Sequence, residues 1–154
     1  MRDWKVMMIL AVHNHRVIAY DILGEGETVD GNRFKRFLIE TLRPKLIQAR
    51  VDNPVILMDN ARPHYHRVVT DYLMRRDWEV LEHPAYSPDM NPCDFDAIHR
   101  IKSGLKGISF PSPATLVAAY DKRIMELNEA HSFPGIYNLP RQWENIVANN
   151  GSYT

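Results

Sequence analysis

The chain has 154 residues, no net charge at pH 7 and a single cysteine, Cys93. This length suits one domain with a real core, and a hydrophobic content of 45% is ordinary for a soluble globular protein. No apolar run approaches the roughly 20 residues that span a bilayer, and the start lacks the pattern of a secretion signal. One cysteine excludes an intrachain disulfide and favours an intracellular protein. We therefore expect one domain over residues 1–154.

The charges are unevenly distributed along the chain. Residues 1–50 carry nine Lys or Arg against six Asp or Glu, whereas residues 51–100 carry five against nine. An acidic middle segment beside basic ones suits a bound cation next to groups that contact phosphate. A solvated acidic surface would explain the same distribution.

Apolar patterning in the first third predicts a β-hairpin followed by a long helix. Two apolar strands, residues 5–13 and 16–23, are joined by the turn-prone pair Asn14-His15. The segment Asp30-Gly31-Asn32 then leads into a helix, which Pro44 must kink or split. Its apolar positions recur at helical spacing and are Phe34, Phe37, Leu38 and Leu42.

Strands and helices alternate in the rest of the chain. Residues 55–58 predict a buried, interior parallel strand, and residues 78–82 a further strand. Between them, Val68, Val69, Tyr72 and Leu73 mark a short helix. Further helices are expected from about 92 to 106, from Ser112-Pro113 to about 130, and around 139–147. This order predicts an α/β domain with a mixed sheet flanked by helices.

Two carboxylates occupy positions that suit a metal site. Asp59 directly follows the strand at 55–58, and ligands gather just past the carboxyl ends of strands in open α/β sheets. Asp94 lies just inside a helix that Asn91-Pro92 opens. Such carboxylates can share divalent ions that assist both the attacking and the leaving oxygen in phosphoryl transfer. Without a metal, Asp59 would be a turn former and Asp94 an ordinary acid of a first helical turn.

Other polar residues leave alternatives open. His64 and His66 are spaced as at the start of some zinc sites, but no Cys or second His pair matches them. Histidines that cap a helix or face solvent are the simpler interpretation. Lys102 and Lys106 belong to the helix that carries Asp94, where they would contact a phosphate backbone or only solvent.

Ordered motifs carry a resemblance to a known family. The first runs from Met58 to His64 (MDNARPH), and the second from Trp78 to Asp94 (WEVLEHPAYSPDMNPCD), with 34 residues between the two aspartates. Residues 26–29 and 139–143 also look like family segments. The chain resembles the catalytic domain of mariner-family transposases, in the group that uses an acidic triad on a ribonuclease-H-like fold. Asn91-Pro92 is closer to a sister branch whose third acid is usually Glu.

The resemblance implies a Mg²⁺- or Mn²⁺-dependent endonuclease with strand-transfer activity, working in the nucleus on transposon ends and target DNA. Asp59 and Asp94 would be catalytic residues and metal ligands. A homodimer is a candidate assembly, and no membrane is implied. The residues expected to contact DNA are Arg62, His64, Lys102 and Lys106.

One departure from the family concerns the first catalytic aspartate. In the family this residue lies on an opening strand upstream of the hairpin, whereas this chain begins almost at the hairpin. Asp3 aligns poorly with that position, and Asp21 lies on the wrong strand, although it is a candidate substitute ligand. We therefore expect a partial catalytic domain without the first strand, without a helix-turn-helix domain and with impaired catalysis.

Two alternatives belong to other functional classes. One is a non-catalytic DNA- or protein-binding remnant of a transposase. Salt-sensitive DNA binding that survives loss of Asp59 and Asp94 would favour it, because phosphate contacts do not need a metal. The other is an unrelated α/β metal hydrolase that uses His64 and His66, which would require stoichiometric zinc.

Overall fold

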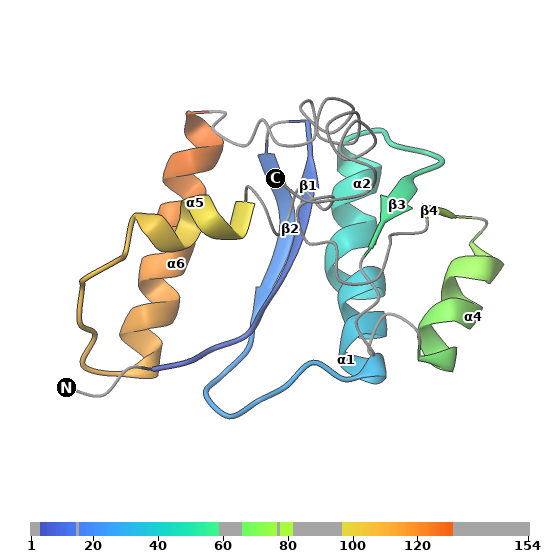
Figure 1. Cartoon of the computed structure of the whole chain (residues 1–154). Coiled ribbons are helices and arrows are strands. Elements are labelled where there is room, and N and C mark those ends of the chain that lie inside the picture. Colours follow the sequence, from blue (N-terminus) through green and yellow to red (C-terminus); the bar gives the residue numbers. More distant parts are fainter. Residues whose placement is uncertain (1–3, 15, 59–65, 77, 82–96, 131–154) are drawn as a thin grey trace, which may run out of the picture.

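The computed structural model describes residues 4–14, 16–58, 66–76, 78–81 and 97–130. The start of the helix expected at 92–106 and the whole of that expected at 139–147 lie outside these ranges. No helix in the described part is long and apolar enough to cross a membrane. The elements, in chain order, are β1 (Met8–His13), β2 (Arg16–Ile22), α1 (Gly31–Arg36), the π-helix η1 (Phe37–Leu42), α2 (Arg43–Gln48), β3 (Val55–Leu57), α4 (Arg67–Arg75), β4 (Glu79–Leu81), α5 (Ile98–Ser103) and α6 (Pro113–Glu129) (Figure 1).

The predicted hairpin is confirmed. Strands β1 and β2 pair antiparallel, from Met8 opposite Ile22 at the open end to His13 opposite Arg16 at the turn. The register shifts between Ala11 and Val12. Such a bulge places an extra residue in one strand and changes which side chains share a face.

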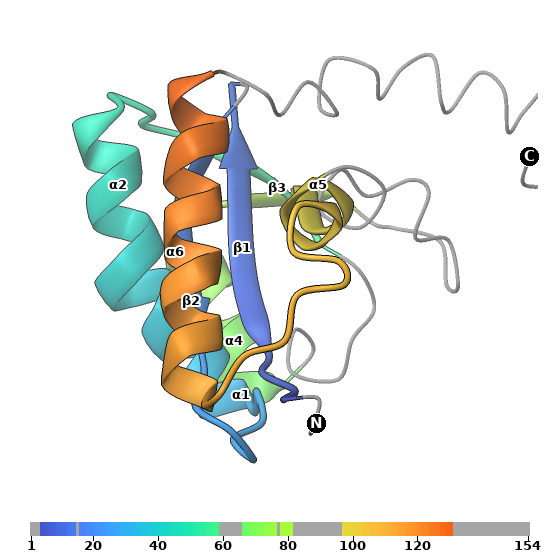
Figure 2. The same ribbon diagram turned by 90° about the vertical axis from the view of Figure 1, so that its left-hand side faces the viewer.

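The hairpin separates two apolar cores. Ile9 and Ala19 pack in the first core with α1, η1, α2 and α4, whereas Val17 packs in the second with α5 and α6. Figures 1 and 2 show α5 and α6 on one side of the hairpin and the α1–η1–α2 run on the other. Because both faces are covered, apolar residues on both faces of each strand are expected, as in the run Met8–Val12 of β1 and Val17–Ala19 of β2. The largest fully buried side chains are Leu23, Leu38, Val69, Ile101 and Ile124.

The helix expected around residues 34–42 is part of a helical run from 31 to 48 that changes register before Pro44. Proline has no N–H, and its ring clashes with the carbonyl four residues earlier in a regular helix. Here the Arg43 N–H bonds to the Leu38 carbonyl, five residues back, which is a π-helical bond. Pro44 then lies in the first turn of α2, where its missing N–H is tolerated. Pro44 therefore divides the run into segments of different hydrogen-bond register, while the helix continues to Gln48.

The helix expected from Ser112-Pro113 is confirmed as α6, and a capping box begins it. The Thr115 N–H donates to Ser112 Oγ at 3.3 Å, and the Ser112 N–H donates to Thr115 Oγ1 at 3.1 Å. These bonds satisfy two donors that the first turn leaves open. The predicted apolar stripe of α6 is confirmed: Ile124 and Leu127 are buried in the second core, Tyr120 packs against it half-buried, and Leu116 is buried as well.

Helix α5 ends at Ser103, earlier than the predicted end near 106. Arg123 of α6 donates to the Arg100 carbonyl through Nη2 at 3.2 Å and Nε at 3.4 Å. A Cβ on Gly104 would lie 2.3 Å from Arg123 Nε, so any other residue would move the Arg123 side chain from this position. The arginine of α6 thereby fixes the last turn of α5.

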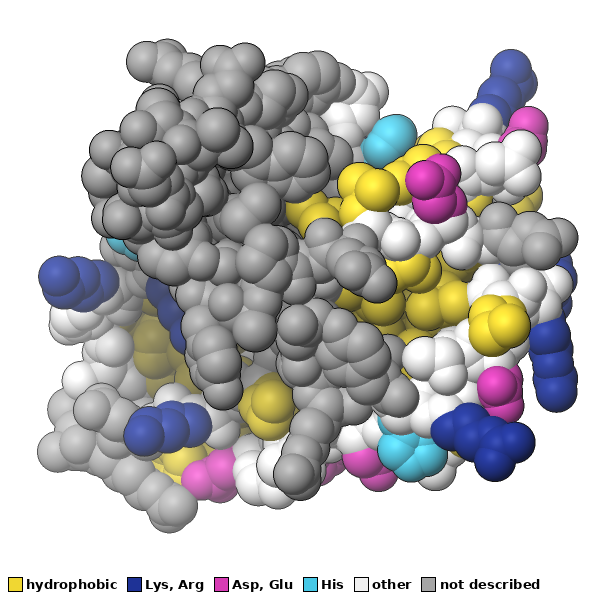
Figure 3. Space-filling view, turned by 45° about the vertical axis from the view of Figure 1, so that its right-hand side comes forward, with side chains coloured by type: hydrophobic (Ala, Val, Ile, Leu, Met, Phe, Trp, Pro, Cys, Tyr) yellow, Lys and Arg dark blue, Asp and Glu magenta, His cyan; other side chains and the backbone are white. Residues whose placement is uncertain are grey.

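Strands β3 and β4 pair in parallel, as expected, with Val55, Ile56 and Leu57 opposite Glu79, Val80 and Leu81. Within the described ranges they form a pair separate from the hairpin. The expected burial of residues 55–58 is wrong, because Val55 is 54% exposed and the other three are half-buried. An apolar run shows that a strand can be buried, whereas its neighbours decide whether it is. Figure 3 shows apolar side chains at the surface on this side of the molecule.

Asn128 of α6 satisfies the backbone of β2 at Val17. Its Oδ1 accepts from the Val17 N–H at 2.8 Å, and its Nδ2 donates to the Val17 carbonyl at 2.9 Å. Val17 itself is only 4% exposed, so water cannot readily replace the amide. A side-chain amide therefore takes the place of a further strand at this point of the sheet edge.

We expect Asn128→Ala to lower the free energy of unfolding by about 1–3 kcal/mol, because it leaves a buried N–H and a buried carbonyl unsatisfied. Urea unfolding measures this change. The control is Asn32→Ala on the exposed side of α1, for which we expect a change within about 0.5 kcal/mol. Equal stability of the two variants would contradict a structural role for the Asn128 amide.

A second bond between the hairpin and α6 is sensitive to alkali. The Tyr20 hydroxyl donates to Asp121 Oδ1 at 2.8 Å. Burial, this hydrogen bond and the charge of Asp121 raise the pKa of Tyr20 from 10.0 to about 12. The folded state thus holds the phenol proton more tightly than the unfolded state does.

This pKa shift predicts that the stability contributed by Tyr20 is complete below about pH 10 and is lost as the pH rises towards about 12. The free energy of unfolding of the wild type should therefore fall more steeply over this window than that of Tyr20→Phe. Urea unfolding at several pH values compares the two proteins. Parallel pH profiles would show that Tyr20 does not hold its proton in this way.

Candidate active site

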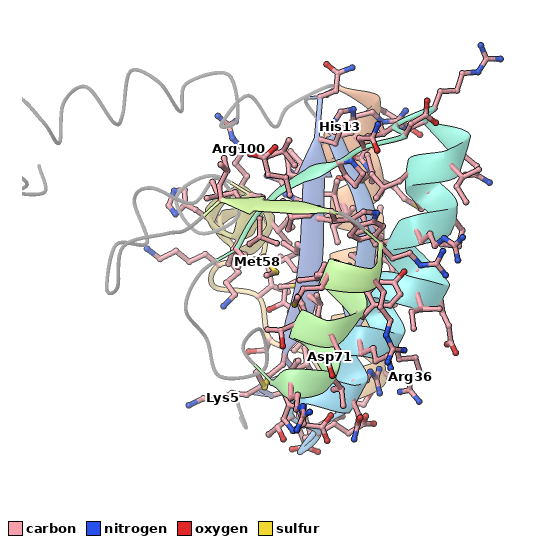
Figure 4. All side chains as sticks on the ribbon, turned by 90° about the vertical axis from the view of Figure 1, so that its right-hand side faces the viewer. Lys5, His13, Arg36, Met58, Asp71 and Arg100 are labelled. Carbon is pink, nitrogen blue, oxygen red and sulfur yellow. The ribbon has the colours of Figure 1, made fainter. Side chains whose placement is uncertain are left out.

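The segments that carry the two predicted metal ligands leave the same end of the β3–β4 pair. Asp59 and Asp94 themselves lie outside the described residues, as do Arg62 and His64. Asp59 directly follows Met58, which packs against the first core at the carboxyl end of β3 (Figure 4). The segment towards Asp94 starts after Leu81, which is opposite Leu57 in the parallel register. This end of a parallel pair is where ligands gather in α/β folds.

The far end of the second segment is anchored in the other core. Ala97, three residues after Asp94, and Ile101 of α5 are both 0% exposed and pack in the second core. The described residues on the near side of each aspartate, Met58 and Ala97, therefore pack in different cores.

Lys102 and Lys106 are exposed, in the last turn of α5 and in the turn after it. Within the described ranges neither lysine makes an ion pair, so both ammonium groups are available to a phosphate. Their predicted contact with DNA remains a prediction.

Asp21 is held by Arg33. Arg33 Nε donates to Asp21 Oδ2 at 2.9 Å, and Nη2 donates to Oδ1 at 3.2 Å. Arg33 Nη1 also reaches Glu27 at 3.3 Å, and hydrogen bonding to Asp21 is the main reason that the pKa of Arg33 is raised. A bidentate arginine occupies both carboxylate oxygens. Asp21 thus joins β2 to α1 in this structure, and its role as a substitute metal ligand stays a hypothesis that the Arg33 pair argues against.

His66 caps a helix, which confirms the simpler interpretation for this histidine. Its Nδ1 accepts from the Val68 N–H at 3.3 Å at the start of α4. A Cβ on Gly31 would lie 2.2 Å from the imidazole, so glycine at the start of α1 lets the two helices meet there. Sequence analysis missed this role of Gly31. In the described part of the chain, no three His, Cys, Asp or Glu side chains gather as a metal site.

Comparison with known proteins identifies the family. The model of the DDE superfamily endonucleases matches residues 2–116. The chain belongs to this family. The Mariner Mos1 transposase of Drosophila mauritiana is 34% identical over 155 residues, which cover 97% of this chain and 45% of the relative. The histone-lysine N-methyltransferase SETMAR of Homo sapiens is 29% identical over 153 residues, covering 97% of this chain and 22% of the relative. The chain thus spans less than half the length of these relatives.

Solved structures place this DDE superfamily member with the mariner transposases. The Mos1 catalytic domain with raltegravir and Mg matches with a TM-score of 0.87 and 33% identity, over 97% of this chain and 77% of that one. The Mos1 paired-end complex with the left transposon end matches with a TM-score of 0.87 and 34% identity, over 97% and 45%. These matches confirm the predicted mariner resemblance and the ribonuclease-H-like α/β fold.

The donor chemistry of this DDE superfamily member suits a divalent metal. Asp59 and Asp94 offer hard carboxylate oxygens, which Mg²⁺ and Mn²⁺ prefer. The Mos1 catalytic domain has been solved with Mg and with Mn, and its paired-end complex with Mn. Divalent metals thus accompany the matched structures.

The Arg33 pair predicts that Asp21→Asn lowers the free energy of unfolding by about 1 kcal/mol, because it replaces a charge-assisted bidentate contact. Mn²⁺ affinity of the folded protein should be unchanged. Urea unfolding measures the first effect and calorimetric Mn²⁺ titration the second, with the exposed Asp52→Asn as control. Lost Mn²⁺ binding in folded Asp21→Asn would restore Asp21 as a ligand.

Proposed function

We propose that this chain is the catalytic domain of a mariner-type transposase, which cuts DNA at transposon ends and joins the ends to target DNA. We also propose that residues 1–154 act as one domain, with Asp59 and Asp94 as catalytic ligands of Mg²⁺ or Mn²⁺. The observation that carries the proposal is the common exit of their two segments from β3 and β4, in a member of the DDE superfamily endonucleases.

The chain's own residues would position the reaction. Divalent ions, when bound, neutralise charge on the scissile phosphate and assist the attack of water or of a DNA 3′-hydroxyl. Asp59 would stay in place because β3 joins it to the first core, and Asp94 because Ala97 anchors it in the second. Both carboxylates must remain ionised to hold cations.

The basic residues near the site would hold the DNA. Lys102 and Lys106 are exposed on and after α5, which suits contact with the phosphate backbone. We assign Arg62 and His64 the same role, because they follow Asp59 in the family motif. Such contacts orient the duplex without reading its sequence.

The matched structures support a proposal for the assembly of this chain. Mos1 has been solved as a paired-end complex, a pre-cleavage transpososome and a strand transfer complex. We propose that this chain likewise works on transposon ends and target DNA as a homodimer. The nucleus is the proposed location, because the DNA substrate of such a reaction lies there.

We expect any nicking of supercoiled plasmid by the purified chain in Mn²⁺ to depend on both aspartates, with Asp59→Ala and Asp94→Ala each reducing it by more than about 100-fold. Loss of a metal ligand should weaken activity at least as much as loss of its supporting groups does. Gel electrophoresis of the plasmid measures the rate. Asp52→Ala, an exposed carboxylate outside the motifs, is the matched control and should nick at the wild-type rate.

Undiminished nicking by both variants would contradict the assigned ligands. A folded wild-type chain that binds DNA but never nicks it would support a non-catalytic DNA-binding remnant instead. Circular dichroism of every variant separates loss of activity from loss of fold.

A further inference from the structure

The outer surface of the α1–η1–α2 run is strongly basic. Residues 31–50 contain six Lys or Arg and one acidic residue, Glu40, although the whole chain has no net charge. Arg33 is paired with Asp21 and Glu27. Within the described part of the chain, the other five make no ion pair. These five define the basic surface, and they are Lys35, Arg36, Arg43, Lys45 and Arg50.

Packing does not explain this basic surface. The run contacts the first core through buried apolar side chains, whereas Arg36, Lys45 and Arg50 are exposed and Lys35 and Arg43 half-buried. Figure 4 shows nitrogen-tipped side chains pointing outward from this run, with Arg36 labelled. Like charges gathered on one helical run repel each other, and helices usually relieve this with acids three or four residues away. A bound polyanion would relieve the same repulsion.

We propose that the basic surface binds the phosphate backbone of a duplex DNA segment, separate from the segment held at Lys102 and Lys106. The choice of DNA as the polyanion rests on the proposed function. In the reaction proposed above, transposon ends are joined to target DNA, so two duplex segments must be held at once. The basic surface would hold one of them.

The layered fold keeps the two DNA contacts apart. Helix α5, which carries Lys102, packs in the second core, whereas the α1–η1–α2 run packs in the first. The hairpin lies between these cores, so the two sets of cations are on opposite sides of it (Figures 1 and 2). One straight duplex cannot lie along both sides of this layer, whereas two separate duplex segments can each contact one side.

The composition of the surface fits DNA better than a protein partner. Protein interfaces are built around buried aromatic anchors and are depleted in lysine. Both aromatic residues of the run, Phe34 and Phe37, are buried. Ile39 and Ile47 are exposed, but they lie two helical turns apart with Arg43 midway between them in sequence, so they form no continuous apolar patch. From Arg36 to Lys45 the helical run rises roughly 14 Å, the length of about four base pairs.

The test measures DNA binding by the full chain in EDTA at a series of salt concentrations. The probe is a fluorescently labelled duplex of 30 base pairs, about 100 Å long, and the signal is its fluorescence anisotropy. The surface variant is Arg36→Gln with Lys45→Gln, because both side chains are exposed and glutamine keeps helix propensity. The control is Lys5→Gln with Lys122→Gln, which removes the same charge from exposed positions elsewhere. A third protein, Lys102→Gln with Lys106→Gln, tests the site of the proposed function.

We expect the surface variant to reduce the slope of log affinity against log salt by about 2, because each lost phosphate contact contributes about 0.9. Its affinity should fall by roughly 10-fold more than that of the control. Arg36→Lys with Lys45→Arg should bind like wild type. A surface variant with the slope and affinity of the control would overturn the proposal.

Failure of this inference and failure of the proposed function are distinguishable. Binding in EDTA needs no metal, whereas nicking in Mn²⁺ tests Asp59 and Asp94. A weakened surface variant supports the inference whether or not the chain nicks DNA. Conversely, nicking that depends on both aspartates, with a surface variant equal to the control, supports the function and overturns the basic surface.

Discussion

Burial of the β1–β2 hairpin on both faces is the constraint on which the rest of the structure depends. One face packs against α1, η1, α2 and α4, and the other against α5 and α6. A sheet covered on both sides stays in register, because a slip by one residue would exchange every side chain between the two cores. Ion pairing at Arg33 and the amide of Asn128 then fasten helices of opposite layers to the same strand, at Asp21 and at Val17.

The two cores also bear on the chemistry. Met58 packs with the first core immediately before Asp59, and Ala97 is buried in the second shortly after Asp94. The described residues that flank the two proposed ligands thus pack on opposite sides of one layer, and β3 and β4 end at the same edge of their parallel pair.

Charge is arranged by layer rather than evenly. The α1–η1–α2 run and the turn after it have five cations that make no ion pair within the described residues, whereas α6 carries more acids than bases. The chain therefore has one basic surface although its net charge is zero. Composition alone argues against a protein coated in positive charge, but a single basic helical surface is enough to contact a phosphate backbone.

Local signals in the sequence determined much of the fold. The turn at Asn14, the cap at Ser112, the split at Pro44 and the helical apolar stripes act over a few residues, so each could be predicted. The motifs around Asp59 and Asp94 likewise identified the mariner resemblance, which the matched structures confirm. The roles of those two aspartates remain predictions, because both lie outside the described residues.

Other features depend on residues far apart in the chain, and only the tertiary structure decided them. The amide of Asn128 meets Val17 across 111 positions, and Arg33 of α1 pairs with both carboxylate oxygens of Asp21 on β2. The exposure of Val55 was predicted wrongly because an apolar strand looks the same in sequence whether or not its neighbours cover it. A sequence pattern shows whether a side chain favours a buried or an exposed position. Which residue it then contacts depends on how the layers pack.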